Sequence, residues 1–376
     1  MTTAPIYNRP LIQIKQTKLN PDYWDAVLRI FDAGKFQDTI VEVLKYVDPE
    51  VPGKCGNAEQ TEFVIPHGSN KIYLSIKDGK YSIKCPFLRV PEKSKVAILR
   101  QIAELNFNTL ILTQLELNDK NELWFRYEAP IELSEPYKVY YIFDEICLNA
   151  DYYDDLYIEK FGAERIEEVV AKKMSPEALA RSWELYNTYL KEIRDYITYF
   201  ESKRSFSFCW DAMAEGFMKI DHVLSPQGYL RVEIEKAVNQ MYANKSLPDV
   251  LNDGKASLEK LEKFEKMKFE DSIYEPEVFI SPRTRADITA VQNRLRKNYD
   301  SAKNEMGGSD YTGATLSLVS GILELLYRCN VPADILNVLQ TGMEKASGQE
   351  WKLASEALWP AVNQIMDMKP GEPIKS

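Results

Sequence analysis

IYLSIKDGKYSIKCPF, residues 72–87, is the stretch that decides the fold of the first part of this 376-residue chain. Ile72, Leu74 and Ile76 alternate on one face of a predicted strand, and Asp78-Gly79 is a strong two-residue turn signal. The partner strand continues the alternation with Tyr81, Ile83, Cys85 and Phe87. The stretch therefore predicts a β-hairpin with one buried face.

Helical and strand patterns extend outward from this hairpin. Asn20-Pro21 is typical of a helix start, and apolar residues at helical spacing continue to Gly34 and again over residues 40–47. The order is completed by a third strand before the hairpin, a helix over residues 96–106, two strands over residues 111–127 and a helix over residues 134–162. The order predicts an α+β domain, α-β-β-β-α-β-β-α, with an antiparallel sheet and helices on one side.

A resemblance supports this interpretation. The sequence YSIKCPFLRVP at residues 81–91, followed by a helix and by LTQLELNDKNELWFRYEAPI at residues 112–131, resembles the bacterial YbjN-like domain. That domain is similar in fold to the small chaperones of type III secretion, which hold an extended stretch of a client protein and do no covalent chemistry. The resemblance spans residues 20–162 and implies a protein-binding role without implying any individual site residue.

Helical signals dominate after residue 162. Ser175-Pro176 begins a long helix with an apolar seam at spacings of four and three: Leu179, Trp183, Tyr186, Leu190, Ile193, Ile197 and Phe200. The seam is either the spine of a helical domain or an intermolecular coiled coil, and its mixture of aromatic and aliphatic sizes favours the spine. Further helices are predicted over residues 207–224, 226–245, 255–270, 284–305, 311–330, 332–346 and 349–367.

These patterns predict two domains. The α+β domain takes residues 1–165, and an all-α helical domain takes residues 166–376. Pro276 and Pro282 bracket an extended linker, and Gly307-Gly308-Ser309 is a helix break. The helical domain is therefore expected to have sub-breaks near residues 274–282 and 307–309.

Composition favours a cytoplasmic protein without a membrane span. Hydrophobic residues make up 45% of the chain and charged residues 28%, which is ordinary for globular domains. Residues 1–20 lack the pattern of a signal peptide, and no segment reaches the roughly 20 apolar residues of a membrane helix. The five cysteines are odd in number and scattered, which favours reduced thiols.

Charge disfavours nucleic acid as a partner. The net charge is −10, from 47 basic and 57 acidic residues, and about half of this excess lies on each predicted domain. Phosphate-backbone binding needs clustered Lys and Arg. The densest basic stretch, residues 283–297, is either a solvated helix face or a nucleic-acid contact, and the solvated face is favoured.

The sequence lacks familiar catalytic signatures. Its two histidines, His67 and His222, have no metal-ligand spacing, and the Gly-rich nucleotide loops and the serine-hydrolase elbow are missing. His222 follows Asp221 on an apolar helix, where a hydrogen-bonded structural role is favoured over a catalytic base. We therefore expect no enzyme activity, no metal and no cofactor.

An acidic and aromatic segment over residues 144–159 is the strongest candidate for an interaction. Asp151, Asp154 and Asp155 are spread around the predicted helix and lack the loop of calcium sites. A solvated face beside a core stripe is favoured, and a protein-binding surface is the alternative.

Candidate partner-binding residues are the aromatic and basic side chains whose strand or helix parity opposes the core: Tyr73, Trp124, Arg126, Tyr141 and Tyr152. The other set of alternate residues on the fifth strand could also face the core, which would bury Trp124. Arg126 shares its face and would be an awkward core neighbour, so the outward position is favoured.

Two functional hypotheses follow. The first is a non-catalytic binding module, chaperone-like or adaptor, that holds a segment of a protein partner of unknown identity. The alternative is a structural subunit of a larger secretion, phage or defence complex. Either hypothesis is compatible with a homo-oligomer.

Overall fold

The computed structural model describes residues 3–12, 23–169 and 171–369, and the chain divides into two compact units. The helical unit comprises residues 1–14, 173–274 and 283–376, and the α+β unit comprises residues 15–172 and 275–282. Three segments thus lie in a different unit from the one that a single boundary after residue 165 assigns, and the shortest, residues 166–172, extends the α+β unit. Residues 1–14 join the helical unit, and residues 275–282 join the α+β unit.

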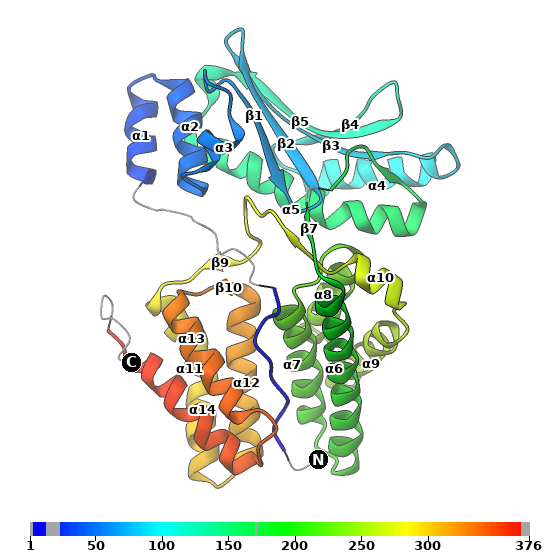
Figure 1. The fold of residues 1–376 in the computed structure, drawn as a ribbon, viewed down its shortest axis with the longest axis vertical. Coiled ribbons are helices and arrows are strands. Elements are labelled where there is room, and N and C mark those ends of the chain that lie inside the picture. Colours follow the sequence, from blue (N-terminus) through cyan, green and yellow to red (C-terminus); the bar gives the residue numbers. More distant parts are fainter. Residues whose placement is uncertain (1–2, 13–22, 170, 370–376) are drawn as a thin grey trace. The chain divides into compact units, whose positions relative to one another are not determined.

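The α+β unit contains an antiparallel sheet in the order β1-β2-β3-β5-β4, with β6 pairing the end of β3. This is the predicted antiparallel sheet with helices on one side (Figure 1). Its elements are α1 (Trp24–Asp32), α2 (Phe36–Val47), α3 (Val51–Cys55), β1 (Glu62–His67), β2 (Asn70–Lys77), β3 (Lys80–Arg89), α4 (Lys95–Asn108), β4 (Gln114–Leu117), β5 (Glu122–Pro130), α5 (Pro136–Phe161) and β6 (Glu164–Arg165). The predicted helix start at Asn20-Pro21 lies outside the described residues.

The predicted hairpin is confirmed. β2 and β3 pair up to Lys77 and Lys80, and Asp78 and Gly79 form the turn with φ of 53° and 71°. Two consecutive residues of positive φ match the twist of the flanking strands, and Asp-Gly adopts them at little cost. The hairpin therefore sets the register that sends alternate side chains to opposite faces.

One face of the sheet and the helices α2, α4 and α5 share a single hydrophobic core. The strand residues in this core alternate as predicted, and Tyr81, Ile83, Cys85, Leu123 and Phe125 are each 0% exposed. Residues 275–282 also contribute to it, because Phe279 and Ile280 are buried there. The Phe279 ring packs edge-on against Phe143, with centroids 5.5 Å apart. The segment that the sequence predicts as a linker is therefore also part of the core.

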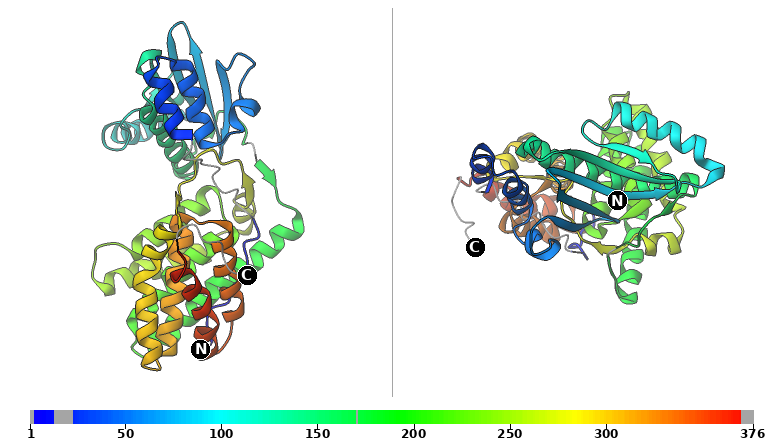
Figure 2. Two further views of the ribbon diagram at one scale, coloured as in Figure 1. Left: turned by 90° about the vertical axis from the view of Figure 1, so that its left-hand side faces the viewer. Right: turned by 90° about the horizontal axis from the view of Figure 1, so that it is seen from above.

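The helical unit is formed by nine described helices, of which α11 to α14 are yellow to red in Figure 2. They are α6 (Pro176–Ser202), α7 (Phe206–Leu224), α8 (Gly228–Met241), α9 (Leu247–Glu262), α10 (Lys266–Asp271), α11 (Ile288–Gly307), α12 (Tyr311–Arg328), α13 (Ala333–Ala346) and α14 (Trp351–Met366). The short strands β9 (Thr284–Arg285) and β10 (Cys329–Asn330) pair in this unit, and β7 (Ala171–Lys173) pairs with β8 (Tyr274–Pro276) where the chain passes from one unit to the other.

α7 is the central helix of this unit. It packs against α6, α8, α9 and α12, and its residues 212–224 are all buried. The predicted seam of α6 faces this core, where Leu190 and Ile193 are 3% and 1% exposed. A Cβ on Gly216 would lie only 2.3 Å from Ile193 Cγ1, so the close approach of α6 and α7 requires glycine there.

Several helix starts differ from the predicted ones, including that of α11, which begins at Ile288 after the short strand β9. α9 begins at Leu247, well before the predicted residue 255, because Ser246 Oγ accepts the Asp249 N–H at 3.4 Å and Pro248 occupies the first turn. The chain then breaks before the separate helix α10. Ser225-Pro226 does not start a helix, since Ser225 has φ of 45° and ends α7. α8 begins at Gly228.

In the parts of the chain that the structure describes, none of the helices is long and apolar enough to cross a membrane. All five cysteines are free thiols, and Cys85, Cys147, Cys209 and Cys329 are buried.

Candidate functional site

The sheet face opposite the helices of the α+β unit carries a row of side chains that crosses all five main strands. Strand pairing places Val64, Tyr73, Lys84, Arg126 and Gln114 side by side in that order. Their neighbours in sequence point to the core, so this parity is fixed by the buried face. We call this surface the open sheet face.

Trp124 lies on the open sheet face, next to this row. It pairs with Pro86 on β3 and Glu116 on β4, whereas its neighbours Leu123 and Phe125 are fully buried in the core. Of the two parities that the sequence allowed for β5, the structure has the one with Trp124 outside the core. The indole is half-buried, and Arg126 beside it forms an ion pair of 2.8 Å with Glu116.

Tyr73 lies nearer the other edge of the same face. Its hydroxyl donates to Glu167 Oε1 at 2.7 Å, and Lys71 lies 3.2 Å from Glu167 Oε2. Burial and the neighbouring Glu167 carboxylate raise the pKa of Tyr73 to about 12, so the hydroxyl is a neutral donor at physiological pH. The segment after β6 thus reaches this part of the open sheet face through Glu167.

The structure does not bring all five predicted residues together. Tyr73, Trp124 and Arg126 share the open sheet face, whereas Tyr141 and Tyr152 lie on α5, which packs on the opposite face. Tyr141 is 54% exposed, and the Tyr152 ring packs against Tyr153 at 4.9 Å. The aromatic side chains of α5 therefore belong to a different surface.

The acidic segment of α5 is only partly a solvated face. Asp154 is 0% exposed, where it accepts a hydrogen bond from Ser69 Oγ and pairs with Arg165. Burial raises the pKa of Asp154 well above its usual value. Glu145 accepts the backbone N–H groups of Ile111 and Thr113, each at 2.7 Å. These carboxylates bind the chain's own loops, which corrects the expectation of a solvated surface.

A second candidate site lies in the helical unit, where residues 3–12 run as an extended segment among helices. Figure 1 shows this dark blue segment between α6 and α7 on one side and α12 to α14 on the other. Ala4, Tyr7 and Ile12 are 2%, 5% and 4% exposed, so they are part of the core. We call the surrounding surface of the helical unit the segment groove.

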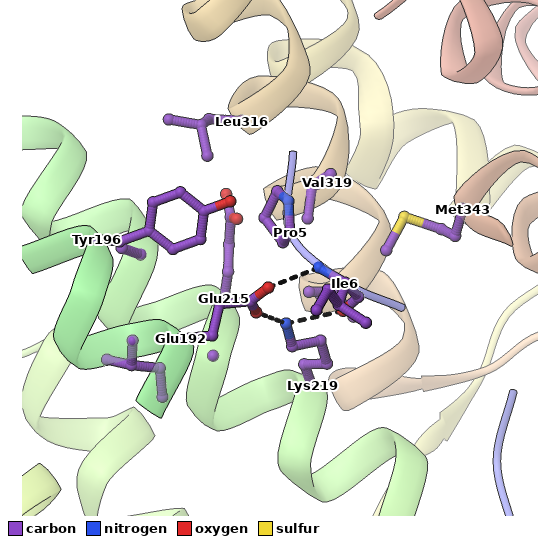
Figure 3. A pocket seen from close by; sticks show the side chains of 13 residues that line it. Pro5, Ile6, Glu192, Tyr196, Glu215, Lys219, Leu316, Val319 and Met343 are labelled. Carbon is purple, nitrogen blue, oxygen red and sulfur yellow. Dashed lines mark hydrogen bonds and ion pairs between the residues drawn. The ribbon is translucent and has the colours of Figure 1, made fainter. Parts of the chain in front are cut away.

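The segment groove holds the backbone of Ile6 by two buried charged side chains (Figure 3). Glu192 on α6 accepts the Ile6 N–H at 2.7 Å, and Lys219 on α7 donates to the Ile6 carbonyl at 2.9 Å. Glu192 and Lys219 also form an ion pair, and the ammonium lies 4.6 Å from the centre of the Tyr189 ring. All polar groups at this position are therefore satisfied although Glu192 and Lys219 are nearly fully buried.

Neighbouring residues of the segment are held in the same way. The Tyr7 N–H donates to Ser347 Oγ at 2.9 Å, and Ser347 Oγ donates back to the Tyr7 carbonyl at 3.3 Å. Tyr196 donates to the Thr3 carbonyl at 2.7 Å. Backbone bonds from the Ala4 N–H to Gln349 at 2.7 Å and from the Leu11 N–H to Val223 at 3.0 Å extend the pattern along the segment.

Two side chains of the segment are recognised individually. The Tyr7 hydroxyl lies 3.1 Å from His222 Nε2, and Arg9 donates to Glu344 Oε1 at 2.8 Å. Further bonds connect the Arg9 guanidinium to Asn337, Gln340 and Thr341. Burial and the nearby Arg283 lower the pKa of His222 to about 3, so the imidazole is neutral beside Tyr7. His222 thus has a hydrogen-bonded structural role.

A small cavity of about 10 Å³ lies beneath the segment, bordered by Pro5, Ile6 and Glu215. Both Glu215 oxygens are buried and have no hydrogen-bond partner among the described residues. Burial, with the added effect of Asp211, raises the pKa of Glu215 well above its usual value. The cavity has room for about one water molecule, which could satisfy the carboxyl group.

Sequence reasoning missed Lys84 and the whole segment groove. A usable signal for the groove was present in α7, where Asp211, Glu215 and Lys219 recur every four residues and residues 212–220 are otherwise apolar. Charges on one stripe of an apolar helix indicate buried polar partners. The sequence could not reveal that one of those partners is the backbone of residue 6.

The basic stretch after residue 282 is mostly a solvated helix face. Arg294, Arg296 and Lys297 on α11 are exposed, whereas Arg283 is directed inward and pairs with Asp221 at 2.6 Å. Within residues 3–12, 23–169 and 171–369, no three or more His, Cys, Asp or Glu side chains are grouped so as to hold a metal ion.

Comparisons with known proteins do not indicate a family for this chain. No family model matches the sequence, and no curated protein matches it.

Proposed function

We propose that this protein is a non-catalytic protein-binding module, chaperone-like or adaptor, whose α+β unit holds an extended segment of a partner protein. The observation that carries the proposal is the position of Tyr73, Trp124 and Arg126 on the open sheet face. Aromatic side chains with an arginine beside them are the commonest energetic anchors of protein interfaces.

The shape of the open sheet face suits an extended ligand. Trp124 and Tyr73 lie on β5 and β2, with β3 between them, so a segment that crosses the strands could contact both rings. Lys84 lies beside Tyr73 on the intervening strand β3, and Arg126 lies two residues from Trp124 on β5. Both offer donors to carbonyl or carboxylate groups of the segment. We also propose that the α+β unit is related to YbjN-like domains and type III secretion chaperones, and that the protein is cytoplasmic.

The test has two stages. The intact protein is first used as bait in its native host, and co-purifying proteins are identified by mass spectrometry. Affinity for a purified partner is then measured by calorimetry with the wild type and with Trp124→Ala. We expect Trp124→Ala to weaken binding by about 2 kcal/mol while thermal unfolding changes little, because the ring lies outside the core.

Tyr141→Ala is the control, since it removes an aromatic ring that is 54% exposed and lies on α5, away from the open sheet face. We expect it to bind the partner as the wild type does. A stable Trp124→Ala protein that binds with full affinity would refute the proposed face, and so would an equal loss in the two variants.

A structural subunit of a larger assembly is the second candidate, favoured by apolar side chains around the end of α4. Phe107 and Ile111 are 89% and 88% exposed, and Val96 on the same helix is 66% exposed. Exposed apolar side chains that gather in one patch are typical of a surface that a permanent partner covers. Fixed stoichiometry through purification, with a partner lost on Phe107→Ser, would favour this candidate, whereas exchange of partners would favour the binding module.

A further inference from the structure

We propose that the segment groove of the helical unit is a second protein-binding site, which accepts in trans an extended partner segment of the same chemistry as residues 3–12. That chemistry is a small residue, then a tyrosine three positions later and an arginine two positions after the tyrosine, as in Ala4, Tyr7 and Arg9. In the structure the chain's own N-terminal segment occupies the groove.

The first argument is that the groove binds the backbone of the segment. Glu192 and Lys219 bond both polar groups of Ile6, at 2.7 and 2.9 Å, while the Ile6 side chain remains 41% exposed. Ser347 likewise bonds both backbone polar groups of Tyr7, because its Oγ accepts the Tyr7 N–H and donates to the Tyr7 carbonyl. Contacts of this type would hold any extended chain in the same position, whatever its side chain at residue 6.

The second argument is that the groove recognises a few side chains of the segment individually. Ala4 and Tyr7 are buried, the Tyr7 hydroxyl meets His222 at 3.1 Å, and Arg9 meets Glu344 at 2.8 Å. Backbone contacts that give affinity, combined with a few pockets that give specificity, are the usual design of an extended-peptide site.

The third argument is that the groove walls pack on each other without the segment. α6 packs on α7, α7 on α12, α12 on α14 and α14 on α13, which connects both sides of the groove through helices alone. Residues 3–12 contain no helix, so their departure removes none from either side of the groove.

The fourth argument is that the resident segment leaves the groove incompletely satisfied. Glu215 borders the cavity beneath Pro5, and both of its oxygens are without a partner among the described residues. Pro5 has no backbone N–H to donate. A partner segment with another residue at this position could therefore compete with the resident one.

The test uses the full chain and a variant that lacks residues 1–12. A fluorescent peptide of residues 3–12 is titrated with each protein, and binding is followed by fluorescence anisotropy. We expect saturable binding to the truncated variant, with a dissociation constant on the order of 10 μM, and much weaker binding to the full chain, whose groove is occupied. A folded truncated variant that does not bind the peptide would overturn the proposal.

Peptide variants test the recognition itself. Tyr7→Phe and Arg9→Ala peptides should bind about tenfold more weakly, because each loses hydrogen bonds that the groove supplies. The matched control is an Ile6→Val peptide, which keeps both backbone bonds and should bind within about twofold of the parent. Equal affinity of all four peptides would show nonspecific binding and would also overturn the proposal.

If the truncated variant does not fold, a protease site inserted between residues 14 and 15 provides a second measurement. Cleavage leaves residues 3–12 bound without a covalent link, and exchange for labelled peptide is then followed. Exchange supports the site, whereas a segment that is retained for days or does not rebind refutes it. A concentration-dependent dimer that excess peptide dissolves would overturn the assignment of a foreign partner and make a second copy of this chain the occupant.

Discussion

Glu192 and Lys219 form a buried ion pair that a third residue completes through its backbone. Ile6 donates its N–H to Glu192 at 2.7 Å and accepts from Lys219 through its carbonyl at 2.9 Å. A buried ion pair offsets its desolvation cost only when its remaining donors and acceptors are also bonded. The pair and the N-terminal segment therefore stabilise each other.

Lys219→Met should lower the free energy of unfolding of the helical unit by about 3–5 kcal/mol, because it leaves the Glu192 carboxylate buried without its cation. Urea unfolding followed by tryptophan fluorescence measures the change. Lys191→Met is the control, since its partner Asp195 lies on the exposed side of α6, and it should cost at most about 0.5 kcal/mol. A double variant, Lys219→Met with Glu192→Leu, should recover much of the loss; a simple sum of the two single effects would contradict the pairing.

Glu215→Met should stabilise the protein by about 1–3 kcal/mol, the cost of an unsatisfied buried polar group. The thioether has a similar length and fills the same position between α7 and the N-terminal segment. Thermal and urea unfolding of the variant measure the gain. Glu192→Met serves as the contrast and should destabilise, because Glu192 has partners. A destabilised Glu215→Met protein would show that the carboxyl group is bonded in solution.

The parts of the fold that the sequence predicts well are those in which one residue pattern determines one local structure. Asp78-Gly79 permits consecutive positive φ values, and the alternation on both sides of it fixes which face is buried. For the fifth strand the alternation left two possible faces for Trp124, and the charge of Arg126 on the same face favoured the outward one. The structure has that face, because Leu123 and Phe125 are buried in the core.

The features that the sequence does not predict depend on contacts between distant residues. Ile6 lies far from Glu192 and Lys219 in sequence, and no periodicity links an extended segment to the helices that hold it. Phe279 is similar, because a short apolar stretch between two prolines is typical of a linker. Its burial depends on the ring of Phe143 on another element, which only the tertiary structure reveals.

Phe279→Ala should destabilise the α+β unit by about 3–4 kcal/mol, because the ring is 4% exposed and packs on Phe143. The reason is the lost burial together with the cavity that remains. Hydrogen exchange of amides in β2 and β3 measures the change in this unit separately from the helical one. Phe206→Ala is the control, since Phe206 is 47% exposed, and should leave those amides unchanged.

A related fragment experiment tests the same contact. Residues 15–172 alone lack Phe279 and Ile280, which belong to the core of this unit. We expect the fragment to unfold cooperatively but at a lower temperature than its counterpart in the full chain. Equal stability would contradict the contribution of residues 275–282.

Asp211→Asn should make the protein more stable at neutral pH than the wild type, by an amount that depends on pH. Burial, with the added effect of Glu305, raises the pKa of Asp211 from 3.8 to about 7 in the folded protein. Between these two values the unfolded carboxyl is ionised while the folded one keeps its proton, so the folded state binds more protons. The contribution of Asp211 to stability is therefore fully present below pH 3.8 and is lost as the pH rises to about 7.

Asparagine removes this titration and keeps the shape of the side chain. The advantage of Asp211→Asn over the wild type should be small near pH 4, grow steadily, and level off above pH 7 at on the order of 4 kcal/mol. The lowered pKa of His222 makes stability rise with pH over a similar pH range. This effect is the same in both proteins, so it does not change the difference between them. Urea unfolding at pH 4, 5.5, 7 and 8 measures the difference. A flat profile for Asp211→Asn would mean that the pKa of Asp211 is not raised in the folded protein.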